Sequence, residues 1–416
     1  MEMYERTSED VRSLIGHAKL DENKLTPITQ VLHFSFSDEK YFCYKLLQLD
    51  SHLAQVLQEG SEIYFKGGKT EEVVLCSNSQ TYELREAETS NSLIVVPGLL
   101  WPKESNLNQS LDKSLEEDNL NISNSFITNT DQLDTASNRT VKKQSVHKIL
   151  HTYYKVHRIK PKFRKLFDLL QITKYNGPEN EYNINKKFLF TYGHLLSTVQ
   201  ASSKELQDGF HEIHALEINN HFRILEIEYE FRVVSYMMAV IEENSWNFLS
   251  VSRKETIDSL KNFVPQAVIE GLFDIYTIWK GDDQFSYKPH LIGRLYAQTI
   301  LKNSSKFNLD DFLMTWQASM PEGMKTDISH LKGIALVDRE ANPACIKALD
   351  NYALPITLLE RFQAMFKIKK LWTLEQMEPY IECFTTPSLS LTTLISKYSR
   401  ASTVNGIRMY GAKHSS

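Results

Sequence analysis

The run from Gly333 to Lys413 restricts the possible folds of this 416-residue chain more than any other stretch. Apolar residues recur at helical spacing in three successive segments of the run. The second segment begins with Thr373-Leu-Glu-Gln376, a Thr-x-x-Gln capping box that is typical of a helix N-terminus. Asn405-Gly406 is the preferred pair for a two-residue hairpin turn, and the residues after it alternate as in a strand. Three helices followed by a hairpin indicate a helix-turn-helix with a wing.

Prolines and basic residues refine this prediction. Pro355 is expected in the first turn of the first helix, and Pro379 is expected to kink the second. Residues 384–416 contain four basic residues and no acidic ones, namely Lys397, Arg400, Arg408 and Lys413. The first two are expected on the outer side of the third helix and the third on the wing. Such a surface fits contacts to DNA phosphates. In the alternative interpretation the winged helix docks a protein, and this face only keeps it soluble.

The N-terminal part has a different, β-rich character. Six short strands are expected, at Val31–Phe36, Tyr41–Gln48, Glu62–Lys66, Glu72–Cys76, Thr81–Leu84 and Leu93–Val96. A brief helix between them is predicted to begin after Asp50 and end at Gly60, with Leu53, Val56 and Leu57 inward. Such segments predict a small sheet or incomplete barrel, whose open edges must be covered or paired. Before them, Thr7 and Asp10 are expected to cap a short helix.

The stretch from Trp101 to Asn138 is rich in Asn, Ser, Asp, Glu and Thr and has no sustained apolar period. This composition predicts a disordered linker. A flexible chain of this length would span on the order of 35 Å, enough to tether two bodies without fixing their orientation.

A basic stretch follows the expected linker. Residues 139–167 contain ten Lys and Arg and no Asp or Glu. The residues singled out as a candidate patch are Lys155, Arg158, Lys160, Lys162, Arg164 and Lys165. Two interpretations remain open, either a surface for nucleic acid or an acidic partner, or a solvated helix face with a nuclear-targeting run.

Alternating helix and hairpin patterns continue from residue 200 onwards. A helix and two strands around Asn219-Asn220 resemble the end of one winged-helix unit. Helices are then expected at Tyr229–Ile241, Lys254–Leu260, Pro265–Trp279, Pro289–Leu301 and Asn308–Met320, with a hairpin at Leu331–Val337. The predicted fold class is therefore α+β, with a β-rich N-terminal assembly domain followed by tandem winged helices. The predicted domains are 1–100 (assembly), 101–140 (linker), 141–228 and 229–340 (winged-helix-like units) and 341–413 (C-terminal winged helix).

No sequence motif predicts catalysis, a metal site or a bound cofactor. Gly67-Gly-Lys-Thr70 lacks the earlier glycine of a phosphate loop and precedes a strand, so a hairpin turn explains it better than an ATPase. His211 and His214 are three residues apart, whereas the zinc-hydrolase motif needs four, so surface histidines are expected. Trp246, Trp316 and Trp372 lie at helical core spacing and are expected to be buried rather than to stack on bases.

Composition excludes several further classes. A net charge of −5 means that any nucleic-acid surface must be local. The four cysteines are isolated and indicate reduced thiols rather than disulfides or zinc ligands. The acidic N-terminus does not resemble a secretory signal, and no run approaches the ~18 apolar residues of a membrane span.

A long collinear resemblance adds to these observations. The residues that carry it are Val74-Leu-Cys-Ser77, Ala87-Glu-Thr-Ser-Asn91, Lys306-Phe-Asn-Leu309, Trp316 to Met324, Leu331 to Arg339, Lys397-Tyr-Ser-Arg400 and Asn405-Gly406. Together they resemble the Dcc family of sister chromatid cohesion proteins, accessory subunits of the alternative replication factor C clamp loader. The resemblance covers residues 30–100 and 200–413 and is weak between them.

This resemblance implies a nuclear, non-enzymatic subunit of a replication complex. Residues 1–100 would bind the ATPase large subunit and a small accessory subunit of the loader, whose strands would complete the incomplete barrel. The winged helices would contact the catalytic subunit of DNA polymerase epsilon and double-stranded or primer-template DNA, and the sliding clamp would be reached indirectly. The main rival is a freestanding winged-helix regulator that reads DNA sequence, and a second rival is an uncharacterised hydrolase.

Overall fold

The computed structural model describes residues 7–21, 30–34, 43–99, 142–161, 163–304, 306–387 and 389–413. The chain forms two compact units, one from Met1–Gln48 with Glu86–Lys155 and the other from Leu49–Arg85 with Val156–Ser416. Helices and several small sheets occur together, as the α+β prediction requires, and within the described residues no sheet closes into a barrel. The expected linker, residues 101–140, lies outside the described residues. None of the helices in the described ranges is long and apolar enough to cross a membrane.

The described residues of unit 1 include one helix and two parallel strand pairs. Helix α1 (Ser8–His17) begins with the predicted capping box of Thr7 and Asp10. Strand β1 (Gln30–Phe34) pairs with β6 (Lys142–Val146), and β2 (Leu47–Gln48) pairs with β7 (Lys148–Ile159). Residues 142–159, expected at the start of a winged-helix unit, are therefore strands, and the helix-face interpretation of the basic stretch is wrong for them.

A five-stranded sheet has the order β2-β7-β5-β4-β3. Strand β5 runs from Thr81 to Val95 and joins the two separate strands expected there, because no Gly or Pro interrupts this segment. Strands β3 (Tyr64–Lys66) and β4 (Val74–Cys76) form an antiparallel hairpin. Gly67–Thr70 lies in the loop that joins them, residues 67–73. The hairpin forms as predicted, although its loop is longer than a Gly-Gly turn, and a strand rather than the helix of a phosphate loop follows it.

Helix α2 (Ser51–Gln58) belongs to unit 2. The Asp50 side chain accepts a hydrogen bond from the Leu53 backbone N–H, and Gly60 follows the helix with a φ of +75°. The cap and the terminating glycine are as predicted. Leu53 is buried as expected, but Leu57 is 42% exposed, so its expected inward position is wrong.

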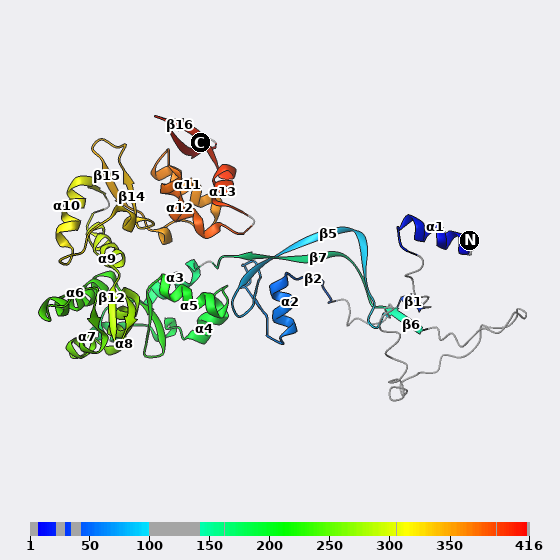
Figure 1. Ribbon diagram of the computed structural model, residues 1–416, viewed down its shortest axis with the longest axis horizontal. Helices are drawn as coiled ribbons and strands as arrows, with labels where there is room; N and C mark the ends of the chain where they lie inside the picture. The colour runs from blue at the N-terminus through cyan, green and yellow to red at the C-terminus, as the bar shows by residue number, and fades with distance from the viewer. Residues whose placement is uncertain are drawn as a thin grey trace, which may run out of the picture. The chain divides into compact units, whose positions relative to one another are not determined.

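The remainder of unit 2 consists of three modules along the chain (Figure 1). The first module, residues 163–225, encloses a small core that includes Leu166, Leu195, Leu206 and Phe210. Its hairpin turns at Asn219 and Asn220, which both have positive φ, as the sequence predicts. Its elements are α3 (Arg164–Leu170), η4 (Gln171–Thr173), η5 (Pro178–Asn183), η6 (Lys186–Phe188), α4 (Tyr192–Thr198), α5 (Ser203–Glu212), β8 (Ala215–Ile218) and β9 (His221–Ile224).

The middle module, residues 226–348, contains the largest core of the molecule's described part, with Trp316 fully buried as expected. Its helices are α6 (Ile227–Glu243), α7 (Arg253–Leu260), α8 (Gln266–Tyr276), α9 (Pro289–Lys302), α10 (Leu309–Ser319) and η7 (Ile328–Leu331). Its sheets are β10-β12-β11 and β13-β15-β14, built from β10 (Val251–Ser252), β11 (Thr277–Gly281), β12 (Gln284–Tyr287), β13 (Lys306–Asn308), β14 (Ala335–Asp338) and β15 (Cys345–Ala348). The helix predicted to Trp279 ends at Tyr276, and Trp279 lies exposed on β11.

The C-terminal module, residues 349–413, follows the predicted order of three helices and a hairpin. Its elements are η8 (Asn351–Ala353), α11 (Leu358–Ile368), α12 (Leu374–Ile381), η9 (Glu382–Phe384), α13 (Leu391–Tyr398), β16 (Ser399–Val404) and β17 (Ile407–Ala412). Pro379 lies inside α12 as predicted. Helix α11 has Thr357 as its N-cap, so the expectation that Pro355 occupies its first turn is wrong.

Candidate nucleic-acid interface

The three helices of the C-terminal module pack around Trp372, which is fully buried. Phe362 and Met365 of α11, Met377 of α12 and Leu394 of α13 belong to the same cluster. The predicted capping box orients α12 within it. The Gln376 backbone N–H donates to the Thr373 hydroxyl at 3.3 Å, and the Thr373 backbone N–H donates to the Gln376 side chain at 3.1 Å. The module therefore has its own core, which positions the hairpin that follows α13.

The β16–β17 hairpin closes through the predicted turn. Asn405 and Gly406 have φ of +51° and +79°, the left-handed pair that a two-residue hairpin of this twist requires. The base of the hairpin is attached to the core by two backbone hydrogen bonds. The Trp372 N–H donates to the Tyr410 carbonyl at 2.9 Å, and the Tyr410 N–H donates to the Trp372 carbonyl at 2.8 Å. The hairpin tip extends away from this attachment, and the side chains from Arg400 to Arg408 are exposed.

Three of the four basic residues predicted for this surface occupy three different elements, and the fourth, Lys413, follows β17. Lys397 lies in the last turn of α13, with its ammonium 5.5 Å from the Tyr398 ring centre. Arg400 is on β16 rather than on the helix, because α13 ends at Tyr398. Arg408 is on β17 and lies over the Tyr410 ring at 5.6 Å, and Lys413 donates to the Lys397 carbonyl at 2.6 Å. In the described part of the chain none of these four residues forms an ion pair with a carboxylate.

The hairpin register separates Arg400 from Arg408. Arg400 pairs with Gly411, whereas Arg408 pairs with Thr403. Directly paired residues share a face and successive residues alternate, so the two guanidinium groups belong to opposite faces of the hairpin. A flat surface laid against one face would meet only one of them. A hairpin that enters a groove would present both, which is the arrangement that fits the two walls of phosphates beside a DNA groove.

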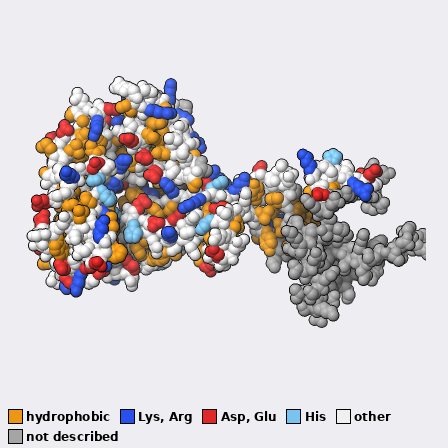
Figure 2. Space-filling model, viewed as in Figure 1, with side chains coloured by type: hydrophobic (Ala, Val, Ile, Leu, Met, Phe, Trp, Pro, Cys, Tyr) orange, Lys and Arg blue, Asp and Glu red, His pale blue; other side chains and the backbone are white. Residues whose placement is uncertain are grey.

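The basic stretch contributes less free charge than its composition indicates. Lys160 pairs with Glu382 at 3.3 Å, and Lys165 pairs with Glu71 at 2.7 Å. Arg164 pairs with Asp168 at 2.7 Å. The Lys155 ammonium lies 5.5 Å from the Tyr153 ring centre, Arg158 is exposed on β7, and Lys162 lies outside the described residues. Figure 2 shows basic and acidic side chains interspersed over the visible face of unit 2, in keeping with the small net charge.

The Lys165–Glu71 pair is half-buried and joins two parts of unit 2. The Lys165 ammonium and the Gly68 backbone N–H both donate to Glu71, and they hold the pKa of its carboxyl below the usual value. Glu71 follows the Gly67–Thr70 loop, so Lys165 connects α3 to the β3–β4 hairpin. Its charge is neutralised there.

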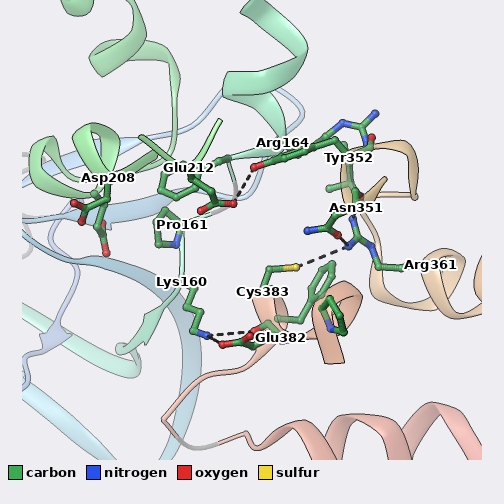
Figure 3. Close-up of a pocket in the computed structure, with 15 residues that line it drawn as sticks. Lys160, Pro161, Arg164, Asp208, Glu212, Asn351, Tyr352, Arg361, Glu382 and Cys383 are labelled. Atoms are coloured by element: carbon green, nitrogen blue, oxygen red, sulfur yellow. Dashed lines mark hydrogen bonds and ion pairs between the residues drawn. The ribbon is translucent and has the colours of Figure 1, made fainter. Parts of the chain in front are cut away.

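A cavity of about 410 Å³ lies between the first and C-terminal modules (Figure 3). The residues that line it include Lys160, Arg164, Asp208, Glu212, Arg361, Glu382 and Cys383. Burial raises the pKa of the Cys383 thiol, so this thiol is protonated near neutral pH and is a poor nucleophile. The walls thus combine both signs of charge with an inert thiol, which suits a hydrated junction between modules.

His214, considered from sequence as a zinc ligand, instead contacts a buried carboxylate. His214 Nδ1 lies 3.0 Å from the Glu230 carboxylate, which also accepts a hydrogen bond from the Tyr276 hydroxyl at 2.8 Å. Glu230 is buried, so this network joins the first and middle modules. Among the described residues no group of three or more His, Cys, Asp or Glu side chains could hold a metal ion.

Arg361 is a structurally important residue that motif reasoning missed. It lies on the apolar face of α11 and is only 4% exposed. Its guanidinium donates to the Pro355 carbonyl at 2.8 Å, the Asn351 side chain at 2.6 Å and the Tyr380 carbonyl at 2.8 Å. The sequence did contain a signal for this role, because Arg361 lies within the apolar stripe of its helix and a buried charge needs hydrogen-bond partners.

Comparison with known proteins extends the similarity over the whole chain. A family model described as sister chromatid cohesion protein Dcc1 matches residues 44–381. The chain is 33% identical over 413 residues to the sister chromatid cohesion protein DCC1 of Xenopus tropicalis, covering 98% of each sequence. It is 32% identical to the protein of the same name from Homo sapiens, again over 98% of each. A yeast relative of that name, from Saccharomyces cerevisiae, is 20% identical over 86% of this chain and 93% of its own.

Proposed function

Because this chain belongs to the family of the sister chromatid cohesion protein Dcc1, we propose that it is a non-catalytic subunit of an alternative replication factor C clamp loader. Family membership supports a role in sister chromatid cohesion. The observation that carries the proposal is the similarity over nearly the full length of this chain and its relatives. In this proposal ATP is hydrolysed by a partner subunit, and the complex works in the nucleus to load or unload the sliding clamp.

The proposed role is that of a two-ended tether. One end, in unit 1, binds the large and small loader subunits, and the other, in the helical modules, binds DNA polymerase epsilon and DNA. Such a tether raises the effective concentration of one partner near the other without a catalytic step. Unit 1 supports its assignment as the assembly end. Strand β1 pairs only with β6 among the described strands, and its Leu32 and Phe34 side chains are 48% and 52% exposed. An open edge with exposed apolar residues is suited to pairing with a partner strand.

Charge on β1 is therefore expected to prevent assembly. We predict that the double variant Leu32→Arg with Phe34→Arg loses most of its copurification with loader subunits when the full chain is used as bait in nuclear extract. The reason is that two exposed apolar side chains would be replaced at a surface that must be desolvated. The measurement is quantitative mass spectrometry of the recovered subunits.

The matched control for this experiment is Leu14→Arg, which changes an exposed leucine of α1 in the same unit. It should leave recovery of the loader subunits unchanged. Equal recovery with the control and the β1 variant would remove β1 from the assembly surface.

The C-terminal module is proposed to act as a winged helix on DNA. Its hairpin would enter a groove, with Arg400 on one face and Arg408 on the other reaching phosphates. The exposed side chains of α13 argue against recognition of a particular base sequence. They are Thr392, Thr393, Ser396 and Lys397, and Ser and Thr hydroxyls can bond to more than one base, so they discriminate less among sequences than bidentate Arg, Asn or Gln side chains do. This disfavours the rival in which the chain is a freestanding sequence-specific regulator.

Reversing two of the basic charges should weaken DNA binding. We predict that Lys397→Glu with Arg400→Glu lowers affinity for duplex and primer-template DNA by about tenfold at moderate salt, since two phosphate contacts become repulsive. The slope of log affinity against log salt should fall in magnitude by about 2. The measurement is fluorescence anisotropy over a salt series.

A second pair of basic residues provides the control for DNA binding. Lys160→Glu with Lys165→Glu changes the same net charge at positions that are already paired with carboxylates. Its salt slope should match that of the unmodified chain. The proposed DNA surface would be refuted by a Lys397/Arg400 variant that binds as well as this control. Discrimination among duplex sequences by the unmodified chain would instead favour the regulator.

A further inference from the structure

Residues 351–354 of the C-terminal module lie against helices α3 and α5 of the first module (Figure 3). Four side chains and two backbone carbonyls make this contact, namely the side chains of Arg164, Phe167, Glu212 and Tyr352 and the carbonyls of Tyr352 and Leu354. We propose that this contact is a clasp that fixes the orientation of the C-terminal module, and that opening it frees the module that carries the basic hairpin. The clasp stands on its contacts alone and does not depend on what the hairpin binds.

Arg164 is the first half of the clasp. Its Nε donates to the Asp168 carboxylate one turn further along α3, at 2.7 Å, and this bond sets the direction of the guanidinium. The Nη1 group then donates to the Leu354 carbonyl at 2.9 Å and also to the Tyr352 carbonyl. A planar guanidinium can serve several acceptors in fixed directions, which a lysine could not do equally well. One side chain therefore binds two backbone carbonyls of another module.

Tyr352 is the second half of the clasp. Its ring stacks on Phe167 of α3 with centres 4.5 Å apart and planes 14° from parallel. Its hydroxyl donates to the Glu212 carboxylate on α5 at 2.9 Å. Burial and the neighbouring Glu212 raise the pKa of Tyr352, so the hydroxyl keeps its proton and remains a donor at neutral pH. The tyrosine is thus held by both helices of the first module that face it.

The clasped segment is firmly attached to its own module. Arg361 of α11 donates to the Asn351 side chain at 2.6 Å and to the Pro355 carbonyl at 2.8 Å, one on each side of Tyr352. Because Arg361 is buried within the C-terminal core, movement of the segment must move α11 with it. The orientation set by the clasp is therefore passed to the whole module.

The clasp can open at modest cost because its surroundings are incompletely packed. The cavity of about 410 Å³ lies beside it, with charged side chains from both modules on its walls. Lys160, which lies just before the first module, pairs with Glu382 of the C-terminal module, but both side chains are at least half exposed and the pair is weakly stabilising. By contrast, the middle and C-terminal modules are joined by the buried Tyr380, whose hydroxyl donates to the Ala335 carbonyl of the middle module at 3.3 Å. The C-terminal module would therefore pivot on the middle module when the clasp opens.

The residue next to Arg164 on α3 connects this helix to a further part of unit 2. Lys165, next to Arg164, binds Glu71 in the loop between β3 and β4 at 2.7 and 2.9 Å. Adjacent side chains of one helix thus hold the C-terminal module on one side and the β3–β4 hairpin on the other. Arg164 and Lys165 of the basic stretch therefore join parts of the fold, and their charges are not available to an external partner.

The clasp is tested by distance measurements between spin labels in the full-length chain. One label replaces exposed Lys187 in the first module and the other replaces exposed Thr403 in the hairpin, with Cys43 and Cys383 changed to Ser. The unmodified clasp should give one narrow distance distribution. Arg164→Ala should broaden it or add a second, separate distance. Hydrogen exchange of the amides in residues 351–354 should accelerate about tenfold in the same variant, as expected for loss of a hydrogen bond to a charged group.

Two further variants make the result decisive. Arg158→Ala removes an exposed arginine of the same basic stretch that has no ion pair among the described residues, and it should leave the distribution narrow. Tyr352→Phe keeps the stacked ring but loses the hydroxyl, and it should broaden the distribution with little risk to folding. Unchanged amide exchange in α6 of the middle module shows that each variant is folded. A distribution that stays narrow in both folded Arg164→Ala and Tyr352→Phe would overturn the clasp.

Discussion

Replacing Arg223 with Ala is expected to lower the free energy of unfolding by about 3–5 kcal/mol, because it removes a buried guanidinium together with its ion pair, its backbone hydrogen bonds and its packing. Arg223 is only 2% exposed on β9. Its Nη1 and Nη2 donate to both carboxylate oxygens of Glu181, at 2.9 and 3.1 Å. It also donates to the backbone carbonyls of Thr173 and Lys174. The alanine variant would leave these two carbonyls without their donor and would open a cavity where the guanidinium packs on Tyr175.

A second Arg–Glu pair from the same region provides the control. Arg232 of α6 pairs with Glu179 at 3.6 Å, and the two side chains are 47% and 59% exposed. Since exposed ion pairs contribute ~0–1 kcal/mol, Arg232→Ala should shift the unfolding midpoint little. Urea unfolding followed by circular dichroism compares the two variants, provided that their m-values agree. If Arg223→Ala were as stable as Arg232→Ala, the buried pair would not stabilise the first module.

Local signals in the sequence predicted much of the helical part correctly. The capping boxes at Thr7 and Thr373 and the turns at Asn219-Asn220 and Asn405-Gly406 all form as expected. In each case a few adjacent residues determine the geometry, through a side chain that satisfies a free N–H or a residue that tolerates positive φ. The burial of Trp316 was predictable for a similar reason, because it lies on the apolar side of helix α10. Trp372 is buried as expected but lies in the segment before α12, and Trp246 is only partly buried and lies outside the helices.

The strands were harder to predict because their partners are distant in sequence. Strands β6 and β7 follow the expected linker and pair in parallel with β1 and β2, about a hundred residues earlier. A basic, Tyr-rich stretch gives no local signal for such pairing. Strand β5 was divided in two by its polar centre, although a strand that is exposed on one side tolerates polar residues. Parallel pairing of this kind depends on tertiary context.

The candidate site was also predictable where local residues determine the geometry and unpredictable where distant partners do. The basic hairpin followed from the Asn-Gly turn and from the absence of acidic residues around it. The position of Arg400 did not, because α13 ends at Tyr398, where the Ser399 hydroxyl donates to the Ile395 carbonyl at 2.6 Å. Composition also could not separate free basic residues from paired ones. Arg164 and Lys165 counted as candidate nucleic-acid ligands, yet their partners Asp168 and Glu71 lie one turn away and 94 residues away.

Replacing Trp372 with Ala is expected to destabilise the C-terminal module by about 3–5 kcal/mol, as for other large-to-small changes at fully buried aromatic residues. The indole Nε1 donates to the Lys369 carbonyl at 2.7 Å and to the Met365 carbonyl at 3.2 Å, so it caps the end of α11. The ring also packs edge-on against Tyr380. Because the Trp372 backbone holds Tyr410 of β17, loss of the core should release the basic hairpin and reduce DNA binding with it.

Trp279 provides the matched control for this variant, since it is 68% exposed on β11. Trp279→Ala should change the free energy of unfolding by less than about 0.5 kcal/mol, because an exposed side chain outside special backbone sites contributes little. The intermediate variant Trp372→Phe should recover part of the lost stability, since it restores ring volume but not the indole N–H that caps α11. Thermal unfolding and anisotropy with duplex DNA, measured on the same preparations, test both consequences. A Trp372→Ala chain that melts and binds DNA like Trp279→Ala would show that the hairpin does not depend on this core.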